Sequence, residues 1–225
     1  KIWLGSYQGI FLHSEFENAF RLSENNKEFS ENDSETTIWA ISEDSNKNIW
    51  IATQSGGIAN LGKELERKEY FLEDSSFTIW DFNIDKKNIF WLATSDGIKA
   101  YQFNGSGFSL LASYFDGRFI DSFYLEENKL WFIDNNQNRI CEIKTSLIQR
   151  NSEEAESNII NCNLKLNTNK IFFTPIFYEN NRLWLSEEKG LHIYDLNKGT
   201  FLKNFYGEEK KIKSSISKVY EWRNS

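Results

Sequence analysis

The sequence predicts an all-β protein built from repeated units, and three observations lead to this prediction. A segment with the pattern apolar-Trp-apolar, followed by a small polar residue, recurs five times along the 225 residues. Successive tryptophans of these segments lie 40 to 53 residues apart, which is the length of a blade in a repeat protein. An apolar strand and a polar turn accompany each segment, as hairpins of antiparallel strands require. Units of four short strands predict a β-propeller with four-stranded antiparallel blades.

The Trp segments supply the second strand of each unit. Their tryptophans are Trp3, Trp50, Trp91, Trp131 and Trp184. The first three segments are followed by Gly-Ile, the fourth lacks this glycine, and the fifth regains it as Gly190-Leu191. Because a large aromatic side chain that recurs at one position of a repeat serves packing, we predict that these tryptophans are core residues.

An apolar strand before each Trp segment supplies the first strand of the unit. These strands cover residues 38–41, 79–82, 120–123, 173–176 and 216–219. Polar stretches such as 44–48 separate them from the Trp segments and predict turns. Pro175 lies within one of these strands, and its missing N–H predicts a bulge or an edge position. A third strand follows the glycine, and a less regular fourth strand, such as 68–72, completes the unit.

The two ends of the chain each carry part of a unit. Strand 216–219 has no Trp segment after it, and Trp3 has no apolar strand before it. If the ends are joined, Val219 and Trp3 are separated by 9 residues, as within the other units. We therefore expect residues 1–14 to complete the blade begun by 216–225, which removes open sheet edges. Residues 1–225 would then form a single propeller domain of five units; the alternative is a fragment of a larger propeller.

The charge balance excludes one class of partner. The chain has 26 Lys and Arg against 33 Asp and Glu, a net charge of −7, and no basic block long enough to bind a polyanion by counterion release. Nucleic acid is therefore not expected as a partner. No apolar run approaches the roughly 18 residues that a membrane-spanning helix needs.

Cys141 and Cys162 match neither a zinc-site spacing nor a redox pair. Two interpretations stay open at this point. The cysteines are either two small buried apolar side chains or a disulfide, which requires an oxidising compartment.

The units resemble the two-component regulator propeller repeat. Residues 41–44, 48–53 and 56–58 match its pattern most fully: a strand that ends in Glu-Asp, a short turn, a Trp strand and a Gly-Gly-Ile turn. The resemblance implies a periplasmic or extracellular sensor region of a hybrid histidine kinase, often one that detects polysaccharide breakdown products. The kinase domain would lie elsewhere in the full-length protein. Because the motif is structural, it transfers no catalytic residue.

Residues that differ between units at the start of the innermost strands are the candidate ligand site, since all blades of a propeller converge there. Tryptophan faces stack on sugar rings, while hydroxyls, carboxylates and cations exchange hydrogen bonds with sugar hydroxyls. The candidates are Trp39, Thr78, Trp80, Asp81, Arg118, Asp121 and Lys218. The alternative interpretation is that Trp39 and Trp80 fill gaps between blades.

The two histidines, His13 and His192, lie on the strand after the glycine. We place both in register with Leu61, Tyr101 and Tyr194, so we interpret them as packing residues. Propeller lyases of the streptogramin-lyase kind use His with Glu for acid–base catalysis, but neither histidine here lies on an innermost strand. We therefore expect the segment not to be an enzyme, and we expect no metal ion or other cofactor.

The predicted function is ligand sensing by the extracytoplasmic portion of a two-component system that responds to oligosaccharides. One alternative is a protein-binding or envelope-glycan-binding scaffold at the cell surface without a signalling role, and a minor one is a propeller lyase. The expected partners are an oligosaccharide or other small ligand, membrane-linked signalling domains, and a second copy of the chain.

Overall fold

A computed structural model describes the backbone over residues 2–6, 9–14, 19–22, 38–53, 57–62, 69–73, 76–126, 128–148, 160–166, 172–179, 181–187 and 190–206. These residues fall into two compact units, Lys1–Phe119 and Ile120–Ser225. Each unit is described by itself.

The first unit contains three antiparallel sheets in its described part. Its strands are β1 (Ile2–Ser6), β2 (Gly9–Ser14), β3 (Ala19–Leu22), β4 (Ile38–Glu43), β5 (Ile49–Thr53), β6 (Gly57–Gly62), β7 (Glu69–Glu73), β8 (Ile79–Ile84), β9 (Ile89–Thr94), β10 (Gly97–Phe103) and β11 (Phe108–Tyr114).

The second unit contains two antiparallel sheets over the residues that are described. Its strands are β12 (Phe123–Glu126), β13 (Lys129–Asp134), β14 (Arg139–Lys144), β15 (Ile160–Lys165), β16 (Phe172–Glu179), β17 (Arg182–Glu187), β18 (Gly190–Asp195) and β19 (Thr200–Tyr206), with the short 3-10 helix η2 (Thr145–Leu147) after β14.

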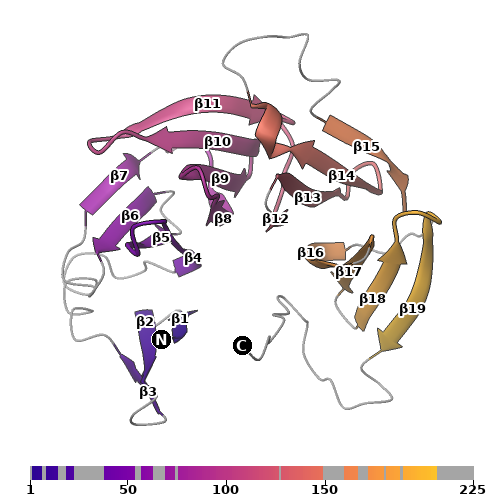
Figure 1. Cartoon of the computed structure of the whole chain (residues 1–225), viewed down its shortest axis with the longest axis horizontal. Coiled ribbons are helices and arrows are strands. Elements are labelled where there is room, and N and C mark those ends of the chain that lie inside the picture. The colour runs from indigo at the N-terminus through magenta and orange to yellow at the C-terminus, as the bar shows by residue number, and fades with distance from the viewer. Residues whose placement is uncertain are drawn as a thin grey trace. The chain divides into compact units, whose positions relative to one another are not determined.

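Every sheet is a meander in which strands adjacent in sequence pair antiparallel, as Figure 1 shows. Sheets β4 to β7, β8 to β11, β12 to β15 and β16 to β19 each have four strands, and the Trp segment is the second strand of each. The predicted all-β class and four-stranded antiparallel blades are therefore confirmed. The register of β16 against β17 shifts between Pro175 and Phe177, so the bulge predicted from Pro175 is also confirmed.

The first sheet contains β1, β2 and β3 within the described residues, with the Trp3 strand β1 at one side. Strand 216–219, which we expect to pair with β1, lies outside the described residues. Closure of the first blade by the two chain ends thus stays a prediction.

Trp50 and Trp131 lie in hydrophobic cores and Trp91 is fully buried, as predicted. Trp184 is only half-buried, and the side chain of Trp3 lies outside the described residues. In the first unit Trp50 is 1% exposed and packs edge-on against Phe90 and Phe103, with ring centroids 4.9 and 5.0 Å apart. In the second unit Trp131 packs with Leu183, Leu185 and other apolar residues of β13, β14, β17 and β18. Every residue of β5 and β9 is buried, so both faces of these strands are covered.

A carboxylate holds the motif tryptophan in two of the sequence repeats. Asp44, in the turn between β4 and β5, accepts hydrogen bonds from the backbone N–H groups of Asn46 and Asn48 at 2.9 Å and from Trp50 Nε1 at 3.0 Å. Asp85 accepts an equivalent bond from Trp91 Nε1 at 3.2 Å. The aspartate of the motif therefore closes the turn and satisfies the buried indole N–H.

We expect protonation of Asp44 to destabilise the fold. Burial raises the pKa of this carboxyl, but the hydrogen bonds from Trp50, Asn48 and Asn46 together outweigh burial and leave its pKa below the ordinary value of 3.8. A depressed pKa stabilises the folded state above the unfolded pKa, and this stabilisation is lost as the pH falls through the folded value. Urea unfolding at a series of pH values below about 5 should therefore show a weaker pH dependence for Asp44→Asn than for the wild type; parallel curves would contradict the assignment.

Cys141 of β14 and Cys162 of β15 form a disulfide, with Cα atoms 4.2 Å apart. This result decides between the two interpretations that the sequence leaves open. The register of β14 against β15 shifts between Ile140 and Glu142, so the bond crosses the pair at this irregularity. It closes a loop of 21 residues in sequence separation.

Candidate functional site

A bulge at the start of two innermost strands positions the predicted tryptophans. In β4 the pairing with β5 passes from Ile38 to Ala40 and leaves Trp39 as the extra residue. In β8 the pairing with β9 passes from Ile79 to Asp81 and leaves Trp80 as the extra residue. Because a bulge re-aims the side chain of its extra residue, Trp39 and Trp80 depart from the strict alternation of their strands at equivalent positions.

Trp39, Trp80 and Phe119 form a contiguous group, called here the aromatic cluster. The ring centroids of Trp39 and Trp80 are 5.0 Å apart, and those of Trp80 and Phe119 are 5.4 Å apart. Both tryptophans are half-buried, whereas Phe119 is 54% exposed. The cluster therefore combines packed indoles with an open aromatic face at its Phe119 end.

The indole N–H groups of Trp39 and Trp80 are buried without a hydrogen-bond partner in the described structure. An unsatisfied buried donor costs about 1–3 kcal/mol, so two in one cluster require an explanation. Phenylalanine at either position would avoid this desolvation cost. The indoles thus offer two unused donors beside the aromatic surface.

Three other predicted site residues, Thr78, Asp81 and Arg118, are not part of the aromatic cluster. Thr78 precedes β8, where its backbone N–H donates to Ser95 Oγ at 3.0 Å. Asp81 is only 5% exposed, so its carboxylate is largely removed from solvent. Arg118 is half-buried, with its Cζ 5.4 Å from the centroid of the Phe115 ring. Thr78, Asp81 and Arg118 all belong to the first unit, as do Trp39 and Trp80.

Two predicted residues lie outside the described part of the first unit. Asp121 belongs to the second unit, where its Oδ1 accepts a bond from Ser122 Oγ at 3.4 Å. Lys218 lies outside the described residues. Their contribution to a ligand site stays a prediction.

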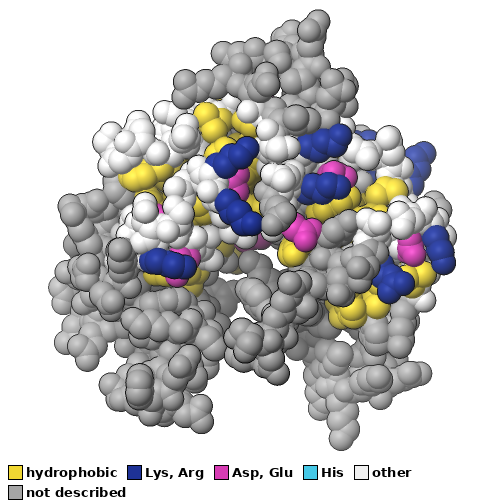
Figure 2. Space-filling model, viewed as in Figure 1, with side chains coloured by type: hydrophobic (Ala, Val, Ile, Leu, Met, Phe, Trp, Pro, Cys, Tyr) yellow, Lys and Arg dark blue, Asp and Glu magenta, His cyan; other side chains and the backbone are white. Residues whose placement is uncertain are grey.

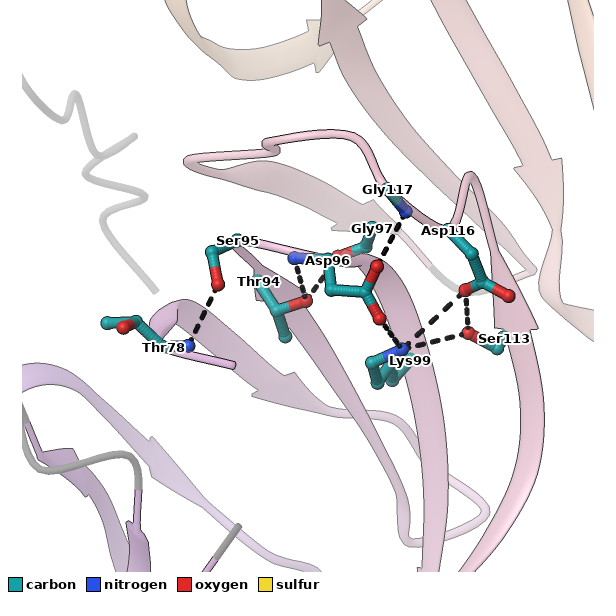
Figure 3. Close-up of polar contacts among 9 residues, drawn as sticks. All are labelled: Thr78, Thr94, Ser95, Asp96, Gly97, Lys99, Ser113, Asp116 and Gly117. Carbon is teal, nitrogen blue, oxygen red and sulfur yellow. Dashed lines mark hydrogen bonds and ion pairs between the residues drawn. The ribbon is translucent and has the colours of Figure 1, made fainter. Parts of the chain in front are cut away.

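Sequence reasoning missed Phe119 and a charged group on β10 and the loop after β11. Lys99 lies 2.9 Å from Asp96 Oδ2 and 3.6 Å from Asp116 Oδ1, and it is 7% exposed (Figure 3). Phe119 follows Gly117 and Arg118 in a connecting loop, and an aromatic residue in a polar connection was the available signal. Lys99 falls between the apolar residues Ile98 and Ala100 of β10, which was the signal for the charged group.

One histidine lies in a different register from the one predicted. His192 pairs with Leu185 and so occupies the repeat position of Lys99, which pairs with Leu92. Tyr194 occupies a different repeat position, two residues further along β18. It is 2% exposed, and its ring centroid lies 5.7 Å from that of Phe201. The packing interpretation of His192 therefore agrees with its burial. The side chain of His13 lies outside the described residues.

Basic and acidic side chains are interspersed on the surface. Figure 2 shows Lys and Arg side chains lying beside Asp and Glu side chains on the face in view. The Lys47–Glu43 pair, at 2.6 Å, is one such contact on the first unit. Within the described residues, no helix has the length and hydropathy needed to cross a membrane.

Residues 32–55 match the two component regulator propeller family. The match includes Asp44 and Trp50, whose hydrogen bond closes the first turn of the unit. The resemblance inferred from the repeat pattern is thus confirmed over this segment. No curated protein matches the sequence at a significant level.

The fold is shared by solved structures of other proteins. The chain is similar to the crystal structure of virginiamycin B lyase from Staphylococcus aureus, with a TM-score of 0.64 and 13% identity over 89% of this chain and 63% of that one. It is also similar to a streptogramin B lyase, with a TM-score of 0.62 and 15% identity over 91% and 67% of the two chains. The chain therefore spans less than two thirds of the first of these proteins. At such identities the likeness shows the fold alone.

The comparison corrects the prediction that the segment is not an enzyme. Both solved structures are of lyases, so a propeller fold and a purely structural repeat motif give no ground for excluding catalysis. The prediction rested on those two features and on the placement of two histidines, one of which was assigned to the wrong register. Because fold does not determine chemistry, the correction assigns no reaction to this chain.

Proposed function

We propose that this chain is a ligand-binding propeller from the extracytoplasmic sensor portion of a two-component signalling system, and that its ligand is an oligosaccharide. The observation that carries the proposal is the aromatic cluster. Bulges aim Trp39 and Trp80 from equivalent strand positions, and Phe119 extends their surface into solvent.

The chemistry of the cluster suits a sugar better than an apolar ligand. Aromatic faces take up the C–H surface of a sugar ring, while its hydroxyls need hydrogen-bond donors and acceptors nearby. The indole N–H groups of Trp39 and Trp80 are unused donors. A ligand oxygen that reached either N–H would accept a hydrogen bond from it, and the bond would offset the desolvation cost that the donor carries in the free protein.

Two further observations support an extracytoplasmic sensor. The family that residues 32–55 match is the two component regulator propeller. The disulfide between Cys141 and Cys162 is of a kind that persists in oxidising compartments and is rare in the cytosol. The signalling step itself would require membrane-linked domains.

The proposal predicts thermal stabilisation by a particular sugar. The protein would be heated with cellohexaose, xylohexaose, hexagalacturonate, a hyaluronan hexasaccharide and a lipopolysaccharide-core oligosaccharide. A true ligand at about a hundred times its Kd adds about 2.7 kcal/mol, which raises the Tm by about 5–10 °C for a chain of this size.

The variants Trp39→Ala and Phe119→Ala should abolish this shift. Leu110→Ala is the matched control, because Leu110 on β11 is as exposed as Phe119, at 54%, and lies outside the aromatic cluster. No shift with any of these sugars would reject the oligosaccharide proposal and favour a protein-binding scaffold. A shift that survives both variants would place the site elsewhere.

A further inference from the structure

We propose that Lys99, Asp96 and Asp116 form a clamp that fixes loop 115–119 and so positions Phe119 against Trp80. The inference rests on the proposed function, because it assigns a positioning role to residues behind the aromatic cluster. None of the three clamp residues belongs to the motif or to the predicted site.

Lys99 occupies a strand position that does not otherwise require a charge. The residue that pairs with the one after the motif tryptophan is Ala59 in β6, Cys141 in β14 and His192 in β18. In β10 the same position holds Lys99, with 9% of its side chain exposed. A buried ammonium is retained only where partners compensate its desolvation. The segments that supply these partners are therefore the ones that Lys99 connects.

The partners of Lys99 come from two different segments. Asp96 belongs to the turn before β10, whereas Ser113 and Asp116 belong to the end of β11 and the loop after it. Lys99 Nζ donates to Asp96 Oδ2 at 2.9 Å and to Ser113 Oγ at 3.1 Å, and the Ser113 hydroxyl donates to Asp116 (Figure 3). The ammonium also lies 5.3 Å from the centroid of the Phe77 ring. The charge thus ties the loop to the turn.

Backbone contacts tie the same loop to the same turn. Gly117 N–H donates to Asp96 Oδ1 at 2.5 Å, and Gly97 N–H donates to the Arg118 carbonyl at 2.6 Å. Gly97 has φ +87°, and a Cβ there would overlap the backbone oxygens of Tyr114 and Phe115. The close approach of the loop therefore requires glycine at position 97. The last of these backbone contacts is made by Arg118, the residue before Phe119.

The loop is held in an unfavourable backbone conformation. Phe115 has φ 62°, in the left-handed region that a bulky side chain rarely adopts. Gly117 is also left-handed, with φ 76°. Glycine adopts this conformation without strain, whereas Phe115 keeps it only where surrounding contacts impose it. The Asp96–Lys99–Asp116 clamp supplies those contacts.

The clamp matters for binding because Phe119 has little burial of its own to hold it. With 54% of its surface exposed, the ring keeps its place beside Trp80 mainly through the backbone that carries it. A loop that is already ordered loses less conformational entropy when a ligand binds. Release of the clamp should therefore weaken sugar binding although no clamp residue touches the sugar.

The test compares Asp96→Ala and Lys99→Met with Lys47→Met. Lys47 forms an ion pair with Glu43 in the same unit, but this pair is exposed, so Lys47→Met is the same chemical change without a clamp. Hydrogen exchange of the peptide 114–119 is measured in the absence of sugar. We expect exchange at least about tenfold faster in the two clamp variants, with β9 unchanged and with no effect of Lys47→Met.

The second measurement is the Kd for whichever of the five named oligosaccharides stabilises the wild type. We expect the clamp variants to raise this Kd by about five- to tenfold, and Lys47→Met to leave it unchanged. Unchanged exchange of 114–119 would overturn the clamp, and faster exchange with an unchanged Kd would overturn its positioning role. If no sugar stabilises the wild type, the proposed function fails, and the exchange rates alone decide the clamp.

Discussion

Replacing Trp91 by alanine should lower the free energy of unfolding by about 3–5 kcal/mol, as expected when a fully buried aromatic side chain is removed. Trp91 is 0% exposed, and its indole N–H donates to Asp85. The variant would lose packing on β9 and would leave the Asp85 carboxylate without this partner. Equilibrium urea unfolding measures the loss directly.

Two further variants make this prediction specific. Trp91→Phe retains an aromatic ring but removes the N–H donor, so its loss should be smaller than that of alanine. Leu110→Ala truncates a side chain that is 54% exposed, and its effect should stay within about 0.5 kcal/mol. Equal losses for Trp91→Ala and Leu110→Ala would contradict the assignment of Trp91 to the core.

Reduction of the Cys141–Cys162 disulfide should destabilise the fold by about 3 kcal/mol, as the chain-entropy model gives for a loop of this length. The bond joins β14 to β15 and spans 21 residues. Its loss acts mainly by raising the conformational entropy of the unfolded chain. The measurement is the Tm with and without a reductant. For a chain of this size the Tm should fall by about 6–12 °C.

The double variant Cys141→Ala, Cys162→Ala is the control for the reductant itself. Its Tm should already be low and should not respond to reduction. A wild type that keeps its Tm after complete reduction would show that the strand pair is stable without the bond.

The repeat pattern predicted most of the fold because its signals are local. The Trp segment, the preceding strand and the turn between them are set by residues within about ten positions of one another. The hairpins β4–β5 and β8–β9 have this predicted arrangement. The fourth unit was predicted less well. Its first strand was placed at 120–123, whereas β12 covers Phe123–Glu126. Ser122 in this segment is buried but polar, so the apolar pattern did not fix the strand start.

The candidate site could be predicted only in part, because bulges are not visible in an apolar pattern. Trp39 and Trp80 were identified by their place at the start of the inner strands, and the register shifts there set their direction. The placement of His192 was wrong for another reason. His192 stands two residues after Gly190, as Lys99 does after Gly97, whereas Tyr194 stands four residues after it. Lys99 and Asp96 were missed because their contacts with Asp116 and Gly117 join residues that are 17 or more positions apart in sequence.

The bond between Asp44 and Trp50 spans only six residues, and this has a consequence for the order of folding. Contacts between near neighbours in sequence lose little loop-closure entropy and form within microseconds. We expect the β4–β5 and β8–β9 hairpins, each with its own aspartate-to-indole bond, to form early and separately. Neighbouring sheets would then assemble from pieces whose registers are already set, which lowers the barrier that non-local strand pairing imposes on all-β chains.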